Sequence, residues 1–172
     1  MQHALAPSAP QAFRGHARHA QPNLSPHEAT PSPVDPIGEL PTSDGFAALL
    51  AAYRATGGTA RGDDVARLLE DHGIGDFIGL ARLIASGEVF DFEWRNTLWI
   101  PMFQFEPRDL SVKVSTQQVL KTLGTGFEGW SCAAWFARPN SWLNNRAPVD
   151  LLGTHLAEVL EAARTDRFIA VG

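Results

Sequence analysis

The sequence predicts a mainly helical fold that contains one small β-hairpin. Amphipathic helical spacing recurs along most of the chain after residue 41, and one run near residue 90 is instead rich in strand-favouring residues. A further observation is that Trp130, Trp135, Phe136 and Trp142 surround a Pro139–Asn140 turn. Aromatic spacing this dense suggests a helical core whose loop is fixed for recognition rather than for chemistry.

Composition narrows the class of protein. The 172 residues suffice for one domain or two small ones, 44% of them are hydrophobic, and the formal net charge is -5. That charge argues against binding dominated by nucleic-acid phosphates. The single cysteine, Cys132, excludes an internal disulfide and a cysteine-rich zinc site, and it favours a reducing, cytoplasmic compartment. We expect no membrane span and no secretory signal, because long apolar runs are missing.

Residues 1–41 are expected to form a mobile tail that is dispensable for folding. They hold most of the 12 prolines and show no apolar period, so burial cannot offset the entropy of ordering them. His3, His16, His19 and His27 are irregularly spaced, which favours a solvated tail over a metal site. We therefore expect no bound metal and no cofactor.

Three short amphipathic helices are predicted next, approximately over Thr42–Gly57, Asp63–Gly73 and Asp76–Gly87. Each begins at Ser, Thr or Asp, which cap helix N-termini, and each ends at glycine. The side chains expected to face the core are Phe46, Leu49, Leu50, Tyr53, Val65, Leu68, Leu69, Phe77, Leu80, Leu83 and Ile84.

The apolar period then changes from helical to alternating. Val89–Trp94 is predicted as a strand, Arg95–Thr97 as a turn and Leu98–Phe105 as the partner strand. Pro101 indicates an edge position or a break in the second strand. Helices followed by a hairpin indicate a winged-helix-like arrangement for residues 42–106.

Residues 107–172 are predicted to be helical again. Ser115–Thr116 can cap a helix that ends at Gly124, and a second helix covers Trp130–Phe136. Pro148 suits the first position of a helix. The last helix carries Leu152, Leu156, Val159, Leu160 and Ala163 and is expected to end near Arg167–Ile169.

The search for catalytic residues leaves none that we would assign. Phosphate-binding, dinucleotide-binding and metalloprotease motifs are missing. Gly129–Ala133 faintly resembles a nucleophile elbow around Ser131, but its flanks are helical. Cys132 is expected to be a small buried residue, and His72 and His155 are the histidines of the part predicted to fold. We predict a protein that is not an enzyme, with a small enzyme that uses Cys132 as the third alternative.

A DNA-binding interpretation rests on shape more than on charge. Arg61, Arg67, Arg82 and Arg95 could together form a modest basic patch beside the predicted hairpin. The opposing interpretation, a helix-turn-helix used as a packing scaffold, stays open.

One segment carries a family resemblance. The runs WFARPNSWL (residues 135–143) and RAPVDLL (residues 146–152) resemble the toxin-binding domain of the Xre/MbcA/ParS antitoxin family, and the resemblance covers about Val89 to Gly172. A tryptophan-led helix, a Pro-Asn turn and a Pro-x-Asp-Leu-Leu helix start all match. The matching residues are Trp135, Pro139, Asn140, Leu143, Pro148, Asp150, Leu151 and Leu152.

The resemblance implies a bacterial antitoxin without enzymatic activity. Members of that family bind and neutralise a cognate RES-domain toxin, which consumes NAD, and their C-terminal helical domain covers the toxin's active-site mouth. They often form homodimers and repress their own operon through a helix-turn-helix. The expected partners are therefore a RES-type toxin, operator DNA and a second copy. The alternative is a winged-helix transcriptional regulator that has no toxin partner.

The partner-binding surface is expected near the end of the last helix. Arg164, Arg167 and Phe168 are spaced i, i+3 and i+4, so they share one helical face. Asp166 and Ile169 complete the predicted toxin-binding set. The other possibility is that Phe168 and Ile169 fold back onto the core.

Overall fold

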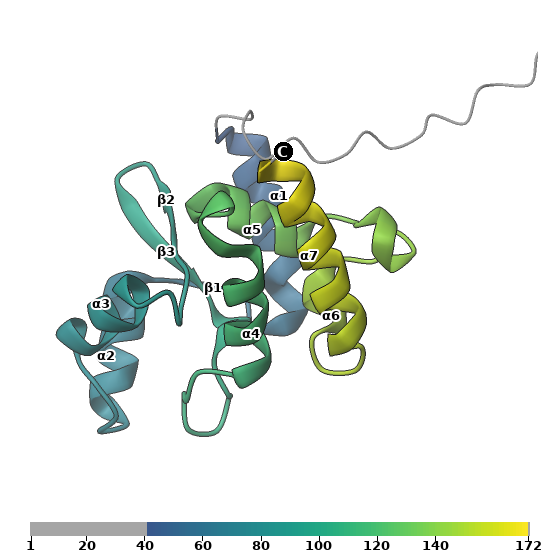
Figure 1. The fold of residues 1–172 in the computed structure, drawn as a ribbon. Coiled ribbons are helices and arrows are strands. Elements are labelled where there is room, and N and C mark those ends of the chain that lie inside the picture. The colour runs from purple at the N-terminus through teal and green to yellow at the C-terminus, as the bar shows by residue number, and fades with distance from the viewer. Residues whose placement is uncertain (1–40, 172) are drawn as a thin grey trace, which may run out of the picture. The chain divides into compact units, whose positions relative to one another are not determined.

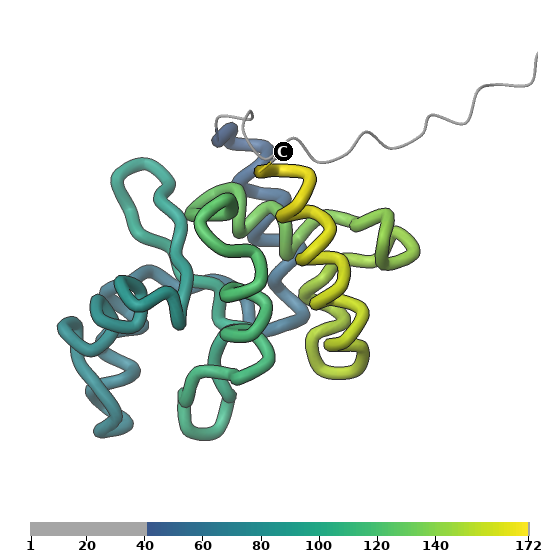
Figure 2. Tube along the Cα trace, in the orientation of Figure 1, coloured from purple at the N-terminus to yellow at the C-terminus, as the bar shows by residue number. Residues whose placement is uncertain are grey.

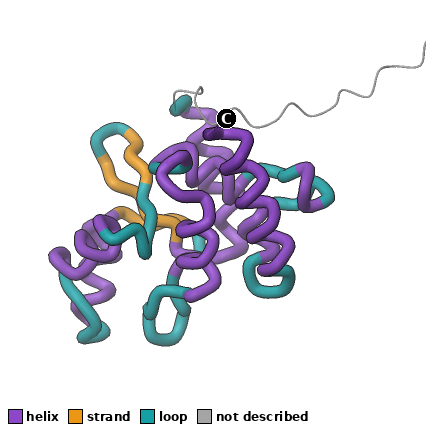
Figure 3. Tube along the Cα trace, viewed as in Figure 1, coloured by secondary structure: helices purple, strands orange, loops and turns teal. Residues whose placement is uncertain are grey.

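The computed structural model describes residues 41–171, so the predicted tail lies, apart from Pro41, outside the described residues. The described part is mainly helical and has one small antiparallel sheet (Figure 1; Figure 3). Its main elements are α1 (Ser43–Tyr53), β1 (Thr59–Arg61), α2 (Gly62–Asp71), α3 (Phe77–Ala85), β2 (Phe92–Trp94), β3 (Thr97–Pro101), α4 (Val114–Leu123), α5 (Gly129–Ala137), α6 (Pro148–Leu151) and α7 (Leu156–Val171).

The sheet has three antiparallel strands in the order β1-β3-β2, where the sequence predicted two. The strand that was not predicted, β1, pairs Ala60 with Ile100. β3 is therefore the central strand, and Pro101 marks its end rather than a sheet edge. Arg95 and Asn96 both have positive φ, 50° and 58°, as a two-residue hairpin turn requires. Thr97 consequently belongs to β3 and not to the turn.

Both strands of the hairpin are shorter than predicted because a buried side chain replaces further strand pairing. After Pro101 the chain enters a short 3₁₀ helix, Met102–Gln104. The fully buried Gln104 amide accepts a hydrogen bond from the Phe90 N–H and donates one to the Phe90 carbonyl, both at 2.8 Å. Phe90 thus has its backbone satisfied without a strand partner.

Two of the three helix starts in the first half have the predicted caps, whereas α2 begins at Gly62 without a side-chain cap, and Asp63 lies inside its first turn. Thr42 Oγ1 accepts from the Gly45 N–H at 3.0 Å, and Asp76 Oδ1 accepts from the Gly79 N–H at 2.8 Å. The predicted inward faces are wrong at two positions, since Leu68 is 38% exposed and Phe77 is 64% exposed. Other side chains of α2 and α3, with the sheet, form a small second core whose buried members are Val65, Ala66, Leu69, Leu80, Val89, Ile100 and Phe105.

The larger core joins both halves of the chain. Leu49 and Tyr53 of α1 are buried with side chains of α4, α5 and α7, and the Tyr53 hydroxyl donates to the Ala133 carbonyl at 2.6 Å. α1 packs against α5, and α4 packs against α7 (Figure 2). Residues on either side of the predicted boundary at 106/107 therefore share one core.

Boundaries in the second half shift slightly from the predictions. α4 begins at Val114 with Lys113 as its cap, so Ser115 and Thr116 lie inside the first turn. Pro148 does begin α6, but α6 has four residues, and Leu152 follows it rather than belonging to the last helix. α7 starts separately at Leu156 and continues through Arg167–Ile169 to Val171. Among the described residues, no helix combines the length and the apolarity that crossing a membrane would need.

Candidate functional site

The Pro-Asn turn is held by one asparagine side chain. Asn140 is 5% exposed; its Oδ1 accepts from the Trp142 N–H at 2.9 Å, which starts the 3₁₀ turn Ser141–Leu143. Its backbone pairs with Arg146 across the loop. The loop closes through Asn144, whose φ is 55°, a conformation that asparagine tolerates better than most residues.

Asp166 fastens this loop to α7. One carboxylate oxygen accepts hydrogen bonds from Trp135 Nε1 at 2.7 Å and Asn140 Nδ2 at 2.6 Å, and the other accepts from Trp142 Nε1 at 3.0 Å. A carboxylate that accepts hydrogen bonds from three N–H groups is held firmly in one position. Asp166, which we predicted to bind a partner, thus makes three hydrogen bonds within the chain and holds the loop against the last helix.

The other residues of the family motif are mostly structural. The motif leucines and Pro148 are buried, whereas Pro139 and Asp150 are exposed. Asp150 lies in the first turn of α6, where a negative charge favours the helix N-terminus. The motif therefore builds the support for α7, and a partner surface must be sought on the solvent side of that helix.

That solvent side presents a row of exposed side chains. Arg164, Arg167, Phe168 and Val171 follow one another at helical spacing, and Phe168 and Val171 are 77% and 72% exposed. Phe168 therefore does not fold back onto the core, and Ile169 is also 49% exposed. Lys121 and Thr122 of α4 lie beside this row, and a depression of about 660 Å³ runs between them. We call these six residues the α7 face: Lys121, Thr122, Arg164, Arg167, Phe168 and Val171.

The arginines of the α7 face are held in place. Arg167 Nη1 donates to the Thr122 carbonyl at 3.3 Å, at the C-terminal end of α4, where a cation is favoured. Its guanidinium lies 3.4 Å from the position that a Cβ on Gly124 would occupy, so a larger residue at 124 would crowd it. Arg164 pairs with Glu161 one turn earlier. With Lys121, the α7 face carries three cations around two exposed apolar side chains.

Of the four arginines proposed for DNA, two line different depressions and the other two have partners within the chain. Arg61 lines a groove between α3 and the hairpin, Arg82 lines another depression next to Ser86 and Asp109, and Arg67 pairs with Asp64 at 3.0 Å. Arg95 stands over the Trp94 ring, 5.3 Å from its centroid, and donates to Ser43. Two of the four are thus already engaged within the chain.

The two candidate nucleophiles both contribute to the fold, Cys132 as a core residue and Ser131 as part of a helix cap. Cys132 is completely buried, and burial raises the pKa of its thiol, with the charges of Asp91 and Glu128 adding to the effect. The Ser131 hydroxyl accepts from the Glu128 N–H at 3.0 Å and donates to the Glu128 carbonyl at 2.8 Å, which caps α5. Within residues 41–171, no group of three or more His, Cys, Asp or Glu side chains is placed to hold a metal ion.

Three members of the α7 face were not predicted from the sequence. Val171 could have been found, because it continues the Arg164, Arg167, Phe168 spacing by one more turn. Lys121 and Thr122 reach the face only through the packing of α4 on α7, which no local pattern signals.

Comparisons with known proteins give no relative: no family model matches the chain, and neither a curated protein nor a solved structure matches it significantly.

Proposed function

We propose that this chain is an antitoxin of the Xre/MbcA/ParS type that binds and neutralises a RES-domain toxin through its α7 face. The observation that carries the proposal is that exposed Phe168 and Val171 of α7 lie beside three cations, Arg164 and Arg167 of the same helix and Lys121 of α4. Aromatic residues and arginine are enriched in the centres of protein interfaces. Contiguous apolar surface that is exposed on a folded protein often marks an interaction site.

The motif geometry supports this proposal in a second way. Loop 139–146 and α5 both reach Asp166, so the family-like residues converge on α7 and fix its position. A rigid surface binds with a smaller entropic cost than a mobile one. Cationic side chains on such a surface suit a toxin cleft that accommodates an anionic nucleotide, because guanidinium groups pair well with carboxylates and phosphates.

The test first asks whether a RES-domain toxin is encoded next to this gene and then measures binding of that toxin to this chain. We expect Phe168→Ala combined with Arg164→Ala to weaken binding at least about tenfold, which corresponds to roughly 1.4 kcal/mol, and to abolish protection from growth arrest. Glu158→Ala is the matched control, since Glu158 is an exposed α7 residue outside the α7 face. Substitutions are preferable to truncation, because a chain that ends before Asp166 would also lose the support of Trp135 and Asn140.

The outcome of this assay distinguishes the possibilities. Full neutralisation by a folded Phe168→Ala, Arg164→Ala variant would exclude the α7 face, and the exposed loop 139–146 would be the next candidate. The absence of any complex between the toxin and the unaltered chain would overturn the antitoxin proposal itself.

The second candidate function is that of a winged-helix transcriptional regulator. The element order α1-β1-α2-α3-β2-β3 and the strand order β1-β3-β2 support a winged-helix-like arrangement of residues 42–106. In that case α3 would be the helix that enters the DNA groove. Salt-dependent binding to the DNA upstream of the gene, weakened by Arg61→Ala and Arg82→Ala, is the expected result, and binding unaffected by either substitution would count against it.

A further inference from the structure

The free edge of the small sheet borders a groove. In the strand order β1-β3-β2, β2 pairs with β3 on one side and with none of the described strands on the other. Residues of β2 and of the segment before it line a groove of about 790 Å³, whose other walls are the ends of α3 and α4 and the start of α5. The β2–β3 hairpin stands beside α5 in Figure 1. We call this space the β2 groove.

The backbone of Glu93 points toward the open side of β2. The hairpin has a two-residue turn, so the residues that flank it, Trp94 and Thr97, exchange hydrogen bonds. The next pair, Glu93 and Leu98, therefore directs its N–H and C=O groups outward, those of Leu98 toward β1 and those of Glu93 toward the open edge. The Met102 N–H donates at 2.9 Å to the residue before β1, as this alternation requires. Backbone groups exposed in this way are a template for another strand.

The β2 groove is negatively charged. Asp91, Glu93 and Glu128 line it, and Lys121 is the cation among its described lining residues. Asp91 and Glu93 are two positions apart, so they project from the same face of the extended chain. Burial raises the pKa of the Asp91 carboxyl, and the charge of Glu93 raises it further, against a hydrogen bond from its own backbone. A cation in the groove would relieve this repulsion.

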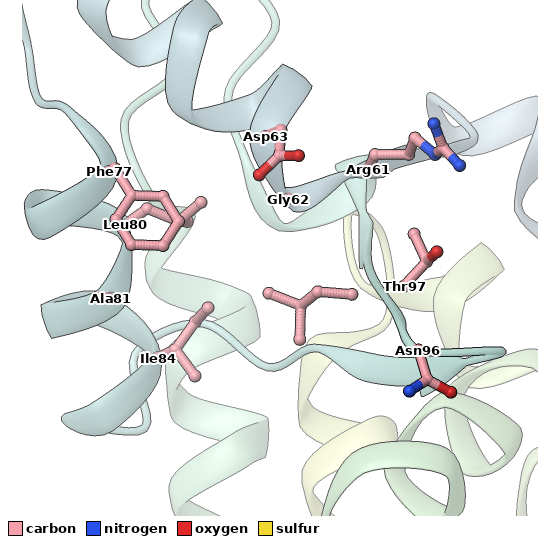
Figure 4. A pocket seen from close by; sticks show the side chains of 10 residues that line it. Arg61, Gly62, Asp63, Phe77, Leu80, Ala81, Ile84, Asn96 and Thr97 are labelled. Carbon is pink, nitrogen blue, oxygen red and sulfur yellow. The ribbon is translucent and has the colours of Figure 1, made fainter.

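The groove between α3 and the hairpin lacks such a charge. Figure 4 shows Phe77, Leu80 and Ile84 projecting from α3, with Asn96 and Thr97 on the strand side. Its charged lining residues are one arginine and one aspartate, so their charges sum to zero. Charge therefore selects a partner at the β2 groove and not at this one.

Charge also decides which strand can fill the β2 groove. Acidic side chains on an exposed edge repel strands of like charge, which is one way in which natural proteins prevent edge-to-edge pairing. A second copy of β2 would bring Glu93 against Glu93, and the chain as a whole has a net charge of -5. An extended segment that carries lysine or arginine is attracted instead.

We propose that the β2 groove binds an extended, basic segment of a partner protein, which adds one strand to the edge of the sheet. The segment forms backbone hydrogen bonds with Glu93, and its successive side chains meet different surroundings. Basic side chains pair with Asp91 and Glu93 on one face, and the apolar side chains between them contact Leu120 and Phe127 on the other.

This site is separate from the proposed toxin-binding function. The β2 groove shares Lys121 with the α7 face but includes no residue of α7 itself. Loss of toxin binding and loss of strand addition are therefore distinguishable, because they follow from substitutions on different elements.

The test measures binding of the peptide Lys-Val-Lys-Val-Lys-Val-Lys to the full chain by isothermal titration calorimetry. We expect saturable binding that Glu93→Lys weakens at least about tenfold, because the substitution reverses the charge at the open edge. Glu70→Lys is the matched control, since Glu70 is also exposed but lies on α2. Both variants change the net charge equally, and both should keep the circular dichroism spectrum of the unaltered chain.

A second peptide separates strand pairing from attraction between charges. The same sequence with a methyl group on every backbone nitrogen keeps the lysine charges but cannot donate backbone hydrogen bonds. We expect it to bind at least about tenfold more weakly, and we expect the unmethylated peptide to slow hydrogen exchange at the Glu93 amide.

Each contrary result would overturn the proposal. Equal binding of the two peptides, or unchanged exchange at Glu93 under saturation, would show attraction between charges without strand addition. A folded Glu93→Lys protein that binds as tightly as the unaltered chain would exclude this edge. The absence of saturable binding to the unaltered chain at about 1 mM peptide would exclude a basic strand as the occupant.

Discussion

Trp135 and Trp142 donate to the same carboxylate but stand in different surroundings. The Trp135 ring is 2% exposed and contacts Phe127 and Phe136, whereas the Trp142 ring is 56% exposed. The indole N–H groups of both residues donate hydrogen bonds to the Asp166 carboxylate. The first tryptophan therefore contributes packing and a hydrogen bond, and the second contributes mainly the hydrogen bond.

Truncating each tryptophan should separate these contributions. Trp135→Ala is expected to lower the free energy of unfolding by about 3–5 kcal/mol, as is usual for a large buried aromatic side chain. Trp142→Ala should cost only about 1 kcal/mol, the net value of one hydrogen bond. Urea denaturation followed by circular dichroism measures both values. Equal losses in the free energy of unfolding for the two variants would contradict this, because the exposed Trp142 would then contribute as much to stability as the buried Trp135.

Gln104 illustrates why a buried polar residue can be required. Its amide satisfies both backbone groups of Phe90 and donates a further bond to the Pro101 carbonyl at 3.1 Å. A buried donor or acceptor that loses its partner costs about 1–3 kcal/mol. Pro101 has no backbone N–H to donate to a neighbouring strand. The Gln104 side chain provides hydrogen bonds to the backbone at this end of the sheet.

Helix α3 depends on a defined start, since it is short and follows Gly75. Asp76 caps it through the Gly79 N–H, and its buried residue is Leu80. A nine-residue helix has little stability of its own and needs both its cap and its packing. The cap therefore also positions the exposed Phe77 beside the groove between α3 and the hairpin.

Removal of this cap should destabilise the protein measurably. We expect Asp76→Ala to lower the free energy of unfolding by about 1 kcal/mol, within the usual range for a capping aspartate. Asp44→Ala is the control, because Asp44 lies in the first turn of α1, where Thr42 provides the cap. Thermal denaturation at one fixed protein concentration compares the two. Equal shifts for both variants would contradict a specific capping role for Asp76.

The described chain folds around a larger core that is not divided at residue 106. Leu49, Tyr53 and Phe103 from the first half are buried together with Val119 and Trp135 from the second. The hydroxyl of Tyr53 is buried and bonded to Ala133, and burial raises its pKa well above the ordinary value. Residues 107–172 therefore lack a complete apolar core without the first half, whereas the buried members of the smaller core all lie within residues 42–106.

Expression of residues 107–172 by themselves should reveal that their folding depends on the first half. We expect residues 107–172 alone to lack a cooperative thermal transition, because separation from α1 and from Phe103 exposes much of their core to water. Residues 42–172 serve as the control and should unfold cooperatively. A fragment 107–172 with native-like helicity and a sharp transition would instead support two independent domains.

Local features of this fold were readable from residues close together in sequence. The caps at Thr42 and Asp76, the Pro148 helix start and the Arg164, Arg167, Phe168 spacing each depend on neighbours within about one helical turn. Backbone sterics and hydrogen bonding act over that distance, so local patterns suffice to predict them. The mainly helical fold with a small sheet was predictable for the same reason.

Features that depend on long-range packing were not readable. β1 has three residues and exists because it pairs with β3, some 40 positions later. Asp166 was predicted to belong to the partner-binding surface, yet it accepts a hydrogen bond from Trp135, 31 residues earlier, and the turn at Asn140 brings the loop back to the same carboxylate. Likewise, α3 contributes Leu80 to the buried residues of the smaller core, whereas Phe77, three residues earlier, remains exposed to solvent. Such contacts follow from which surfaces meet when apolar area is buried, and that choice involves the whole described chain at once.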